Sequence, residues 1–164
     1  IPLLDIHELA AGKMAALLSR RAGRDLFDVH LLLTTSDLED EKLRLGFVVF
    51  GAMNRKDWRT VSIEDVGFEP QEIQSQLLPV LRSDMYAGSG SVSEWSEKMV
   101  RECREQLVRV LPLSDAEGEF LDKLLDHGEV KPSLLTSDAR MVEVIKTHPG
   151  IQWKALNVRQ RKGT

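Results

Sequence analysis

The chain has 164 residues, a formal net charge of −4 at pH 7, and a hydrophobic content of 42%, which together exclude a disordered chain. Only 5% of the residues are aromatic, so the core must be mainly aliphatic, which favours helices over a β-sandwich. The acidic total argues against nucleic-acid binding over the whole surface and still allows a local basic patch.

Apolar positions at helical intervals in the first part of the chain predict three helices, over residues 5–21, 24–33 and 38–54. Asp5 followed three residues later by Glu8 is typical of an N-terminal capping box. Gly23 predicts a break between the first two helices. The run "FVVF" at residues 47–50 is compatible with a strand as well as with a helix.

The second part of the chain also has a helical pattern. Pro70 predicts the start of a helix to about Leu81, and the Gly- and Ser-rich residues 84–92 predict a linker between a region 1–83 and a region 93–164. Further helices are predicted from Ser93 to Val110, from the Ser114 and Glu117 capping box to Gly128, over residues 137–147, and from Pro149 onward. We therefore expect a mostly α-helical bundle.

Charged residues interrupt the first two predicted helices. Lys13 falls among apolar positions, Arg20 follows along the same side, and Arg24 precedes Asp28 by four residues, with Asp25 on the same face as Asp28. One interpretation is a surface ion pair, with the lysine stem along apolar surface. The other is a phosphoryl-transfer site, in which cations offset phosphate charge and a carboxylate binds Mg²⁺ or accepts a proton.

The stretch "LLDIHELAAGKMAALLSRRAGRDLFDVHLLL" resembles the third and fourth motifs of the AbiEii/AbiGii abortive-infection nucleotidyltransferase toxin family. The family pattern is a Glu, a Lys five residues on, an Arg seven further, and then Arg-Asp-x-x-Asp. The matching residues are Glu8, Lys13, Arg20, Arg24, Asp25 and Asp28. The segments "LSDAEGEFLDKLLDHGEVKPSLL" and "HPGIQWKALNVRQRK" resemble the family as well, so the resemblance extends over residues 3–162.

This resemblance implies the C-terminal helical part of a polymerase-β-like nucleotidyltransferase, the toxin of a bacterial toxin–antitoxin or phage-defence pair. Such an enzyme transfers a nucleotidyl group from an NTP to an acceptor, for example tRNA, and a cognate antitoxin protein is its partner. By the same resemblance, Lys13 contacts the nucleotide phosphates and Asp28 is the catalytic carboxylate. The residues expected to position or support them are Arg24, Asp25, Arg20 and Glu8.

The family also has a Gly-Ser-x-x-x-Asp-x-Asp loop whose carboxylates hold Mg²⁺, and this motif is absent from the sequence. The stretch "AGSGSVSEW" at residues 87–95 has Gly and Ser without the two aspartates. We therefore expect the Mg²⁺ ligands in a missing N-terminal part, and an inactive chain when it is alone. The alternative is a non-enzymatic α-helical module that binds RNA or a protein.

The remaining signals concern single residues. Cys103 lies on an apolar stripe and is predicted to be a core residue, and one cysteine suits a reducing, cytoplasmic location. No apolar run reaches the roughly 18 residues that cross a membrane. The histidines lack metal-ligand spacing, so no metal site is predicted. Trp95 and Trp153 are predicted to be packed, and Trp58, among polar neighbours, to be exposed.

The end of the chain is basic. Lys154, Arg159, Arg161 and Lys162 occur with no acidic residue from position 154 onward. One interpretation is a solvated, frayed tail. The other is a basic surface that guides an RNA acceptor toward the active site.

Overall fold

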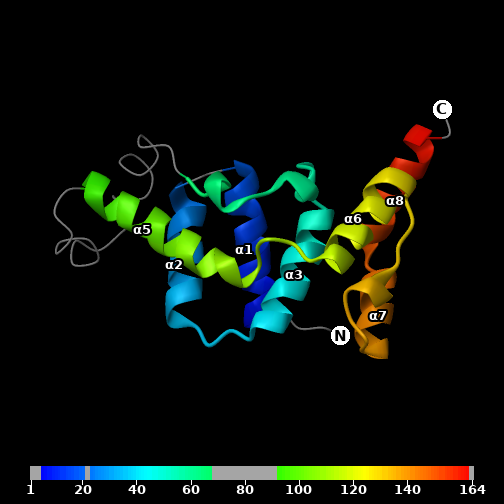
Figure 1. Ribbon diagram of the computed structural model, residues 1–164, viewed down its shortest axis with the longest axis horizontal. Coiled ribbons are helices and arrows are strands. Elements are labelled where there is room, and N and C mark those ends of the chain that lie inside the picture. The colour runs from blue at the N-terminus through cyan, green and yellow to red at the C-terminus, as the bar shows by residue number, and fades with distance from the viewer. Residues whose placement is uncertain (1–4, 21–22, 68–91, 163–164) are drawn as a thin grey trace.

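The computed structural model describes residues 5–20, 23–67 and 92–162, and every regular element within these ranges is helical (Figure 1). The α-helices are α1 (Ile6–Arg20), α2 (Gly23–Thr35), α3 (Asp40–Ala52), α5 (Val92–Gln106), α6 (Asp115–His127), α7 (Ala139–Lys146) and α8 (Pro149–Lys162). Short 3-10 helices are η1 (Trp58–Thr60), η2 (Ile63–Asp65), η6 (Leu107–Arg109) and η7 (Pro132–Leu134). The predicted mostly α fold is confirmed, and the strand alternative for "FVVF" is wrong because this run lies inside α3.

Several helix ends lie where local sequence signals predict them. The carboxylate of Asp5 caps α1 by accepting backbone N–H groups of the first turn at 2.8 and 3.1 Å. Ser114 and Glu117 form the predicted reciprocal capping box, and Gly128 ends α6 with a φ of 66°. The predicted cap Ser93 instead lies one residue inside α5, which begins at Val92.

The helix predicted between Pro70 and Leu81 and the linker up to residue 91 lie outside the described residues. Helix α1 packs against α2 and α3, α2 packs against α5, and α6 packs against α8 (Figure 1). One hydrophobic core contains residues from both sides of the predicted linker, among them Leu17, Phe47, Cys103 and Phe120. Nowhere in the described ranges is a helix long and apolar enough to cross a membrane.

The three tryptophans differ from one another in exposure. Trp95 is 6% exposed and packs in the core, as predicted. Trp58 is completely buried, so its predicted exposure is wrong. The ring centroids of Trp58 and Phe47 are 5.2 Å apart, whereas the neighbouring Arg59 is partly exposed and binds carboxylates. The polar neighbours are therefore on the outside of the η1 turn, and the indole is on the inside.

Arg44 fastens α3 to the start of α6. Its guanidinium binds both carboxylate oxygens of Glu117, from Nε to Oε2 at 3.0 Å and from Nη2 to Oε1 at 2.8 Å. It also donates to the backbone carbonyls of Pro112 at 2.7 Å and Arg109 at 3.2 Å. The group α6 to α8 is thus anchored on the helix that packs against α1.

Candidate functional site

Lys13 and Asp28 meet between α1 and α2. The ammonium of Lys13 donates to Oδ2 of Asp28 at 2.9 Å across 15 residues of sequence. The side chains are 38% and 32% exposed, so solvent and solutes reach both partners. Asp28 therefore binds a cation of α1, and the surface pair that spacing suggests for it with Arg24 is not formed.

A second ion pair crosses the same helix–helix contact. Nη2 of Arg20, the last residue of α1, lies 3.0 Å from Oδ2 of Asp25 in the first turn of α2. The Asp25 side chain is only 8% exposed, whereas Arg20 is 67% exposed. A buried carboxylate needs a cation or hydrogen-bond donors, and the positive N-terminal end of α2 adds to this stabilisation. Asp25 is thus held in one place by an arginine that still faces solvent.

The structure brings together four of the six residues that match the motif, and it leaves two apart. Arg24 is exposed, and its side chain has no ion-pair partner among the described residues. Glu8 lies half-buried in the first turn of α1, more than one turn before Lys13. The paired residues therefore form a ladder along the contact between α1 and α2, and Arg24 and Glu8 lie at its margins.

Polar residues from distant segments gather at the C-terminal end of α1. Lys56 donates from Nζ to the carbonyl of Leu18 at 3.3 Å, and Nδ2 of Asn54 donates to Oγ of Ser19 at 3.3 Å. The carbonyl of Asn54 accepts from Nζ of Lys154 at 2.9 Å. Sequence reasoning missed Asn54 and Lys56, for which the available signal was the polar Asn-Arg-Lys run at the end of the predicted third helix.

The basic C-terminal residues belong to an ordered helix. Helix α8 continues to Lys162, so the basic residues are not part of a frayed tail, whereas the exposure of Arg159 and Arg161 agrees with a solvated surface. Burial lowers the pKa of Lys154, and the nearby charge of Arg161 lowers this pKa further. Nη1 of Arg159 donates to the carbonyl of Gly128 at 3.3 Å, which ties α8 to the end of α6.

Trp153 is 65% exposed on α8, so its predicted packing is wrong. The apolar residues that α8 buries are Ile151, Ala155 and Val158. Trp153 lies on the opposite side of this helix, together with Leu156, which is 46% exposed. Helical spacing correctly predicts the helix but does not predict which apolar side chains a neighbour covers, and in α8 apolar residues lie on both sides.

Few candidate metal ligands are grouped in the described part of the chain. Among its residues, no three His, Cys, Asp or Glu side chains are grouped as metal ligands. Asp25 and Asp28 each bind a basic side chain through Oδ2. Mg²⁺ at nucleotide-binding sites is commonly held by one or two carboxylates together with substrate phosphates and waters, and here both carboxylates are engaged by basic side chains.

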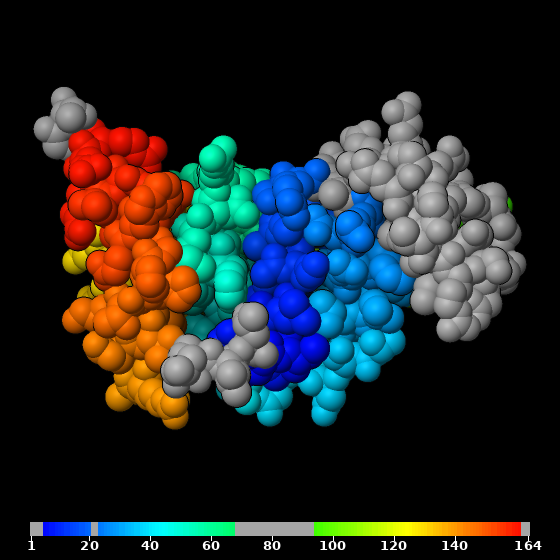
Figure 2. Space-filling model, turned by 180° about the vertical axis from the view of Figure 1, so that it is seen from behind, coloured from blue at the N-terminus to red at the C-terminus, as the bar shows by residue number. Residues whose placement is uncertain are grey.

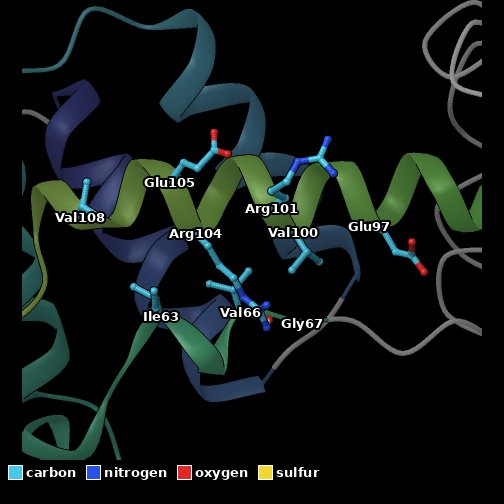
Figure 3. Close-up of a pocket in the computed structure, with 9 residues that line it drawn as sticks. All are labelled: Ile63, Val66, Gly67, Glu97, Val100, Arg101, Arg104, Glu105 and Val108. Atoms are coloured by element: carbon cyan, nitrogen blue, oxygen red, sulfur yellow. The ribbon is translucent and has the colours of Figure 1, made fainter.

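A cavity of about 620 Å³ lies away from these ion pairs, between α5 and the segment that contains η2 (Figure 3). Its lining is largely apolar and includes Ile63, Val66 and Val100. Arg104 reaches across it from α5 and donates to the carbonyl of Val66 at 3.1 Å (Figure 3). None of the predicted site residues lines this cavity, so we place the candidate site at the contact between α1 and α2.

Comparison with known proteins gave one match. A family model described as "Nucleotidyl transferase AbiEii toxin, Type IV TA system" matches residues 1–126. This range contains both ion pairs of the candidate site and does not include α7 and α8. No curated protein and no solved structure matched the chain.

Proposed function

The chain belongs to the AbiEii family of nucleotidyl transferase toxins of type IV toxin–antitoxin systems, and on this premise we propose that Lys13 and Asp28 form its phosphoryl-transfer site. The proposal depends on the 2.9 Å contact between the ammonium of Lys13 on α1 and the carboxylate of Asp28 on α2, because both side chains remain partly exposed. The enzyme to which these residues belong transfers a nucleotidyl group from an NTP to an acceptor hydroxyl.

The ion pair suits this reaction because its partners can separate when substrate binds. A nucleotide polyphosphate carries more negative charge than one carboxylate, so it competes with Asp28 for the ammonium of Lys13. Once Lys13 contacts the phosphates, Asp28 is free to accept the proton of the attacking hydroxyl. In the absence of substrate, each group neutralises the other.

The neighbouring charges position these two groups. Asp25 lies one helical turn from Asp28 on α2, and its bond to Arg20 fixes the start of this helix against α1. Arg24, exposed at the margin of the ladder, would contact phosphate oxygens with its planar guanidinium. Glu8 supports the N-terminal end of α1.

An NTP and Mg²⁺ are the substrate and the metal that nucleotidyl transfer generally uses. The described residues do not supply the metal ligands. We assign these ligands to a part of the enzyme that carries the Gly-Ser-x-x-x-Asp-x-Asp motif, which this sequence lacks. The 164-residue chain alone is then inactive, and robust nucleotide transfer by the purified chain would refute this assignment.

The acceptor in this proposal is an RNA such as tRNA, and the antitoxin is the protein partner. Support for an RNA comes from α8, which carries Lys154, Arg159, Arg161 and Lys162 and no acidic residue. Such a surface attracts phosphates over a distance of about one Debye length, roughly 8 Å at physiological salt.

The test is made in the full-length parent protein with Lys13→Ala and Asp28→Ala. We expect both variants to lose growth inhibition and incorporation of labelled NTP, by a factor on the order of 10² or more. The matched controls are Lys42→Ala and Glu39→Ala, which break a 3.0 Å ion pair at the N-terminal end of α3 and should retain both activities. Undiminished toxicity in both site variants would contradict the assignment.

A stability measurement separates loss of chemistry from loss of fold. Because the side chains of Lys13 and Asp28 are 38% and 32% exposed, breaking their ion pair should cost less than about 1 kcal/mol. Inactive variants that keep nearly all of the parent's free energy of unfolding would therefore support a catalytic role. A large loss of stability would instead assign the pair a structural role.

A further inference from the structure

The outer face of α8 combines one large aromatic side chain with polar and basic neighbours. Trp153 is 65% exposed, and one turn further along the helix Leu156 is 46% exposed. At the helical angle of about 100° per residue, Asn157 and Gln160 share this face with Trp153. Arg159 lies on one flank of the face and Arg161 on the other, and both are exposed.

The last part of the chain, which contains this helix, is basic. From Val144 to Thr164 there are five basic residues and no acidic residue, although the whole chain has a net charge of −4. The occupant best suited to such a face is therefore an anion.

The mixture of groups favours a nucleic acid over a protein partner. A protein interface usually has several apolar side chains at its centre. On this face the amides of Asn157 and Gln160 adjoin a single indole and one leucine. An exposed indole between cations is the arrangement with which proteins stack single-stranded bases while they hold the phosphates. The family match ends at residue 126, so this face is not part of the matched region.

Helix α8 is connected to the end of α1 through Asn54. Lys154 of α8 binds the carbonyl of Asn54, and the side chain of Asn54 binds Ser19, the residue before Arg20. Figure 2 shows α8 in orange and red, the segment after α3 in green, and α1 and α2 in blue next to one another on one face of the molecule. A strand bound along α8 would therefore lead toward the end of α1.

We propose that this outer face of α8 binds a single-stranded segment of RNA, with one base stacked on Trp153 and the phosphates held by the flanking basic residues. The inference rests on the proposed function, because it concerns the acceptor of that reaction. The proposed function names an RNA acceptor, and this inference names a surface that binds it: a stacking platform on α8, outside the ion-pair ladder of α1 and α2. Trp153 is in this role a binding residue and takes no part in the chemistry.

The three tryptophans provide a direct test with the 164-residue chain and a short oligoadenylate. Trp58 and Trp95 are 0% and 6% exposed, so quenching of tryptophan emission by the RNA reports on Trp153. We expect quenching in the original chain and none in Trp153→Phe. Binding measured by anisotropy of labelled RNA should be largely retained in Trp153→Phe, which keeps a stacking ring, and weakened on the order of tenfold in Trp153→Ala.

Two further variants complete the test. Val108→Ala is the matched control, because Val108 is also 65% exposed, and this variant should bind RNA normally. Arg161→Gln should reduce the dependence of log affinity on log salt by roughly one unit, as expected for one lost phosphate contact. Unchanged RNA affinity in Trp153→Ala would overturn the proposal.

A change in Trp153 emission with protein concentration, without RNA, would also overturn the proposal, because it would identify this face as a self-association surface. The test remains distinct from that of the proposed function. If Lys13→Ala is inactive but Trp153→Ala binds RNA normally, only the inference about α8 fails. If RNA binds at Trp153 but Lys13→Ala is fully active, only the assignment of the reaction site fails.

Discussion

Replacing Arg44 by Met should loosen the contact between α3 and α6 more than any loss of a surface ion pair. The methionine keeps much of the apolar stem and removes the guanidinium. Four hydrogen bonds are lost, of which two go to Glu117 at 3.0 and 2.8 Å and two go to backbone carbonyls at 2.7 and 3.2 Å. Glu117 then keeps one bond, from the backbone N–H of Ser114 at 2.7 Å.

The expected magnitude follows from burial. The side chain of Glu117 is 11% exposed, and removing one partner of a buried ion pair costs roughly 3–5 kcal/mol. Arg44 is 28% exposed, so water relieves part of this cost, and we expect about 3 kcal/mol. For a chain of this size, that corresponds to a fall in Tm of roughly 6–12 °C.

The assay is urea unfolding of the original chain, Arg44→Met, Glu117→Gln and the double variant, followed by far-UV circular dichroism. Glu117→Gln in the Arg44→Met background removes the unpaired charge, so the double variant should lose less than the sum of the single losses. The difference should be about 1–3 kcal/mol. If Arg44→Met loses less than about 1 kcal/mol, or if the two losses simply add, the guanidinium does not anchor α6 as described.

Three further predictions use the same protein. Gly51→Ala should destabilise the fold by about 3 kcal/mol or prevent folding, since its Cβ would lie 2.0 Å from Nε1 of Trp58, and a normal urea midpoint would contradict this packing. Burial raises the pKa of the Cys103 thiol to about 12, so iodoacetamide at mildly alkaline pH should label Cys103 only when urea unfolds the chain. Rapid labelling of the native protein would contradict the burial of this thiol. The hydrogen bond from His30 lowers the pKa of the Glu102 carboxyl in the folded chain. The pair therefore stabilises the fold at pH values above the unfolded carboxyl pKa of about 4.3. This stabilisation is lost as the pH falls through the lower pKa of the folded state. His30→Gln should therefore make unfolding less sensitive to acid, and identical acid-unfolding curves for both proteins would count against the link between α2 and α5.

Much of the helical framework could be predicted because its signals are local. The cap at Asp5, the capping box of Ser114 and Glu117, and the glycine stop at Gly128 each depend on groups within about four residues. The composition of the candidate site could also be predicted, since Lys13 and the acidic residues of α2 stand out from their apolar surroundings.

The partners within that site could not be predicted from spacing. Along a single helix, Arg24 is four residues from Asp28 and is its nearest candidate cation. In the folded chain, Asp28 instead faces α1 and binds Lys13, 15 residues away. The choice depends on which side of α2 packs against α1, and helix spacing carries no information about that contact.

Trp58 and Trp153, whose exposures were predicted wrongly, show the same difference between what local sequence determines and what the packing of helices determines. The sequence by itself determined that Trp153 belongs to a helix and that Trp58 follows a polar segment. Only the tertiary structure decided that Trp58 lies under η1 against Phe47, while no described helix covers Trp153. Backbone hydrogen bonds and side-chain periodicity arise from near neighbours in the chain, but burial arises when a distant segment covers a surface. For this reason, the sequence predicts the helices and the residue types of the site, whereas the ion pairs and the exposed indole of α8 depend on how the helices pack.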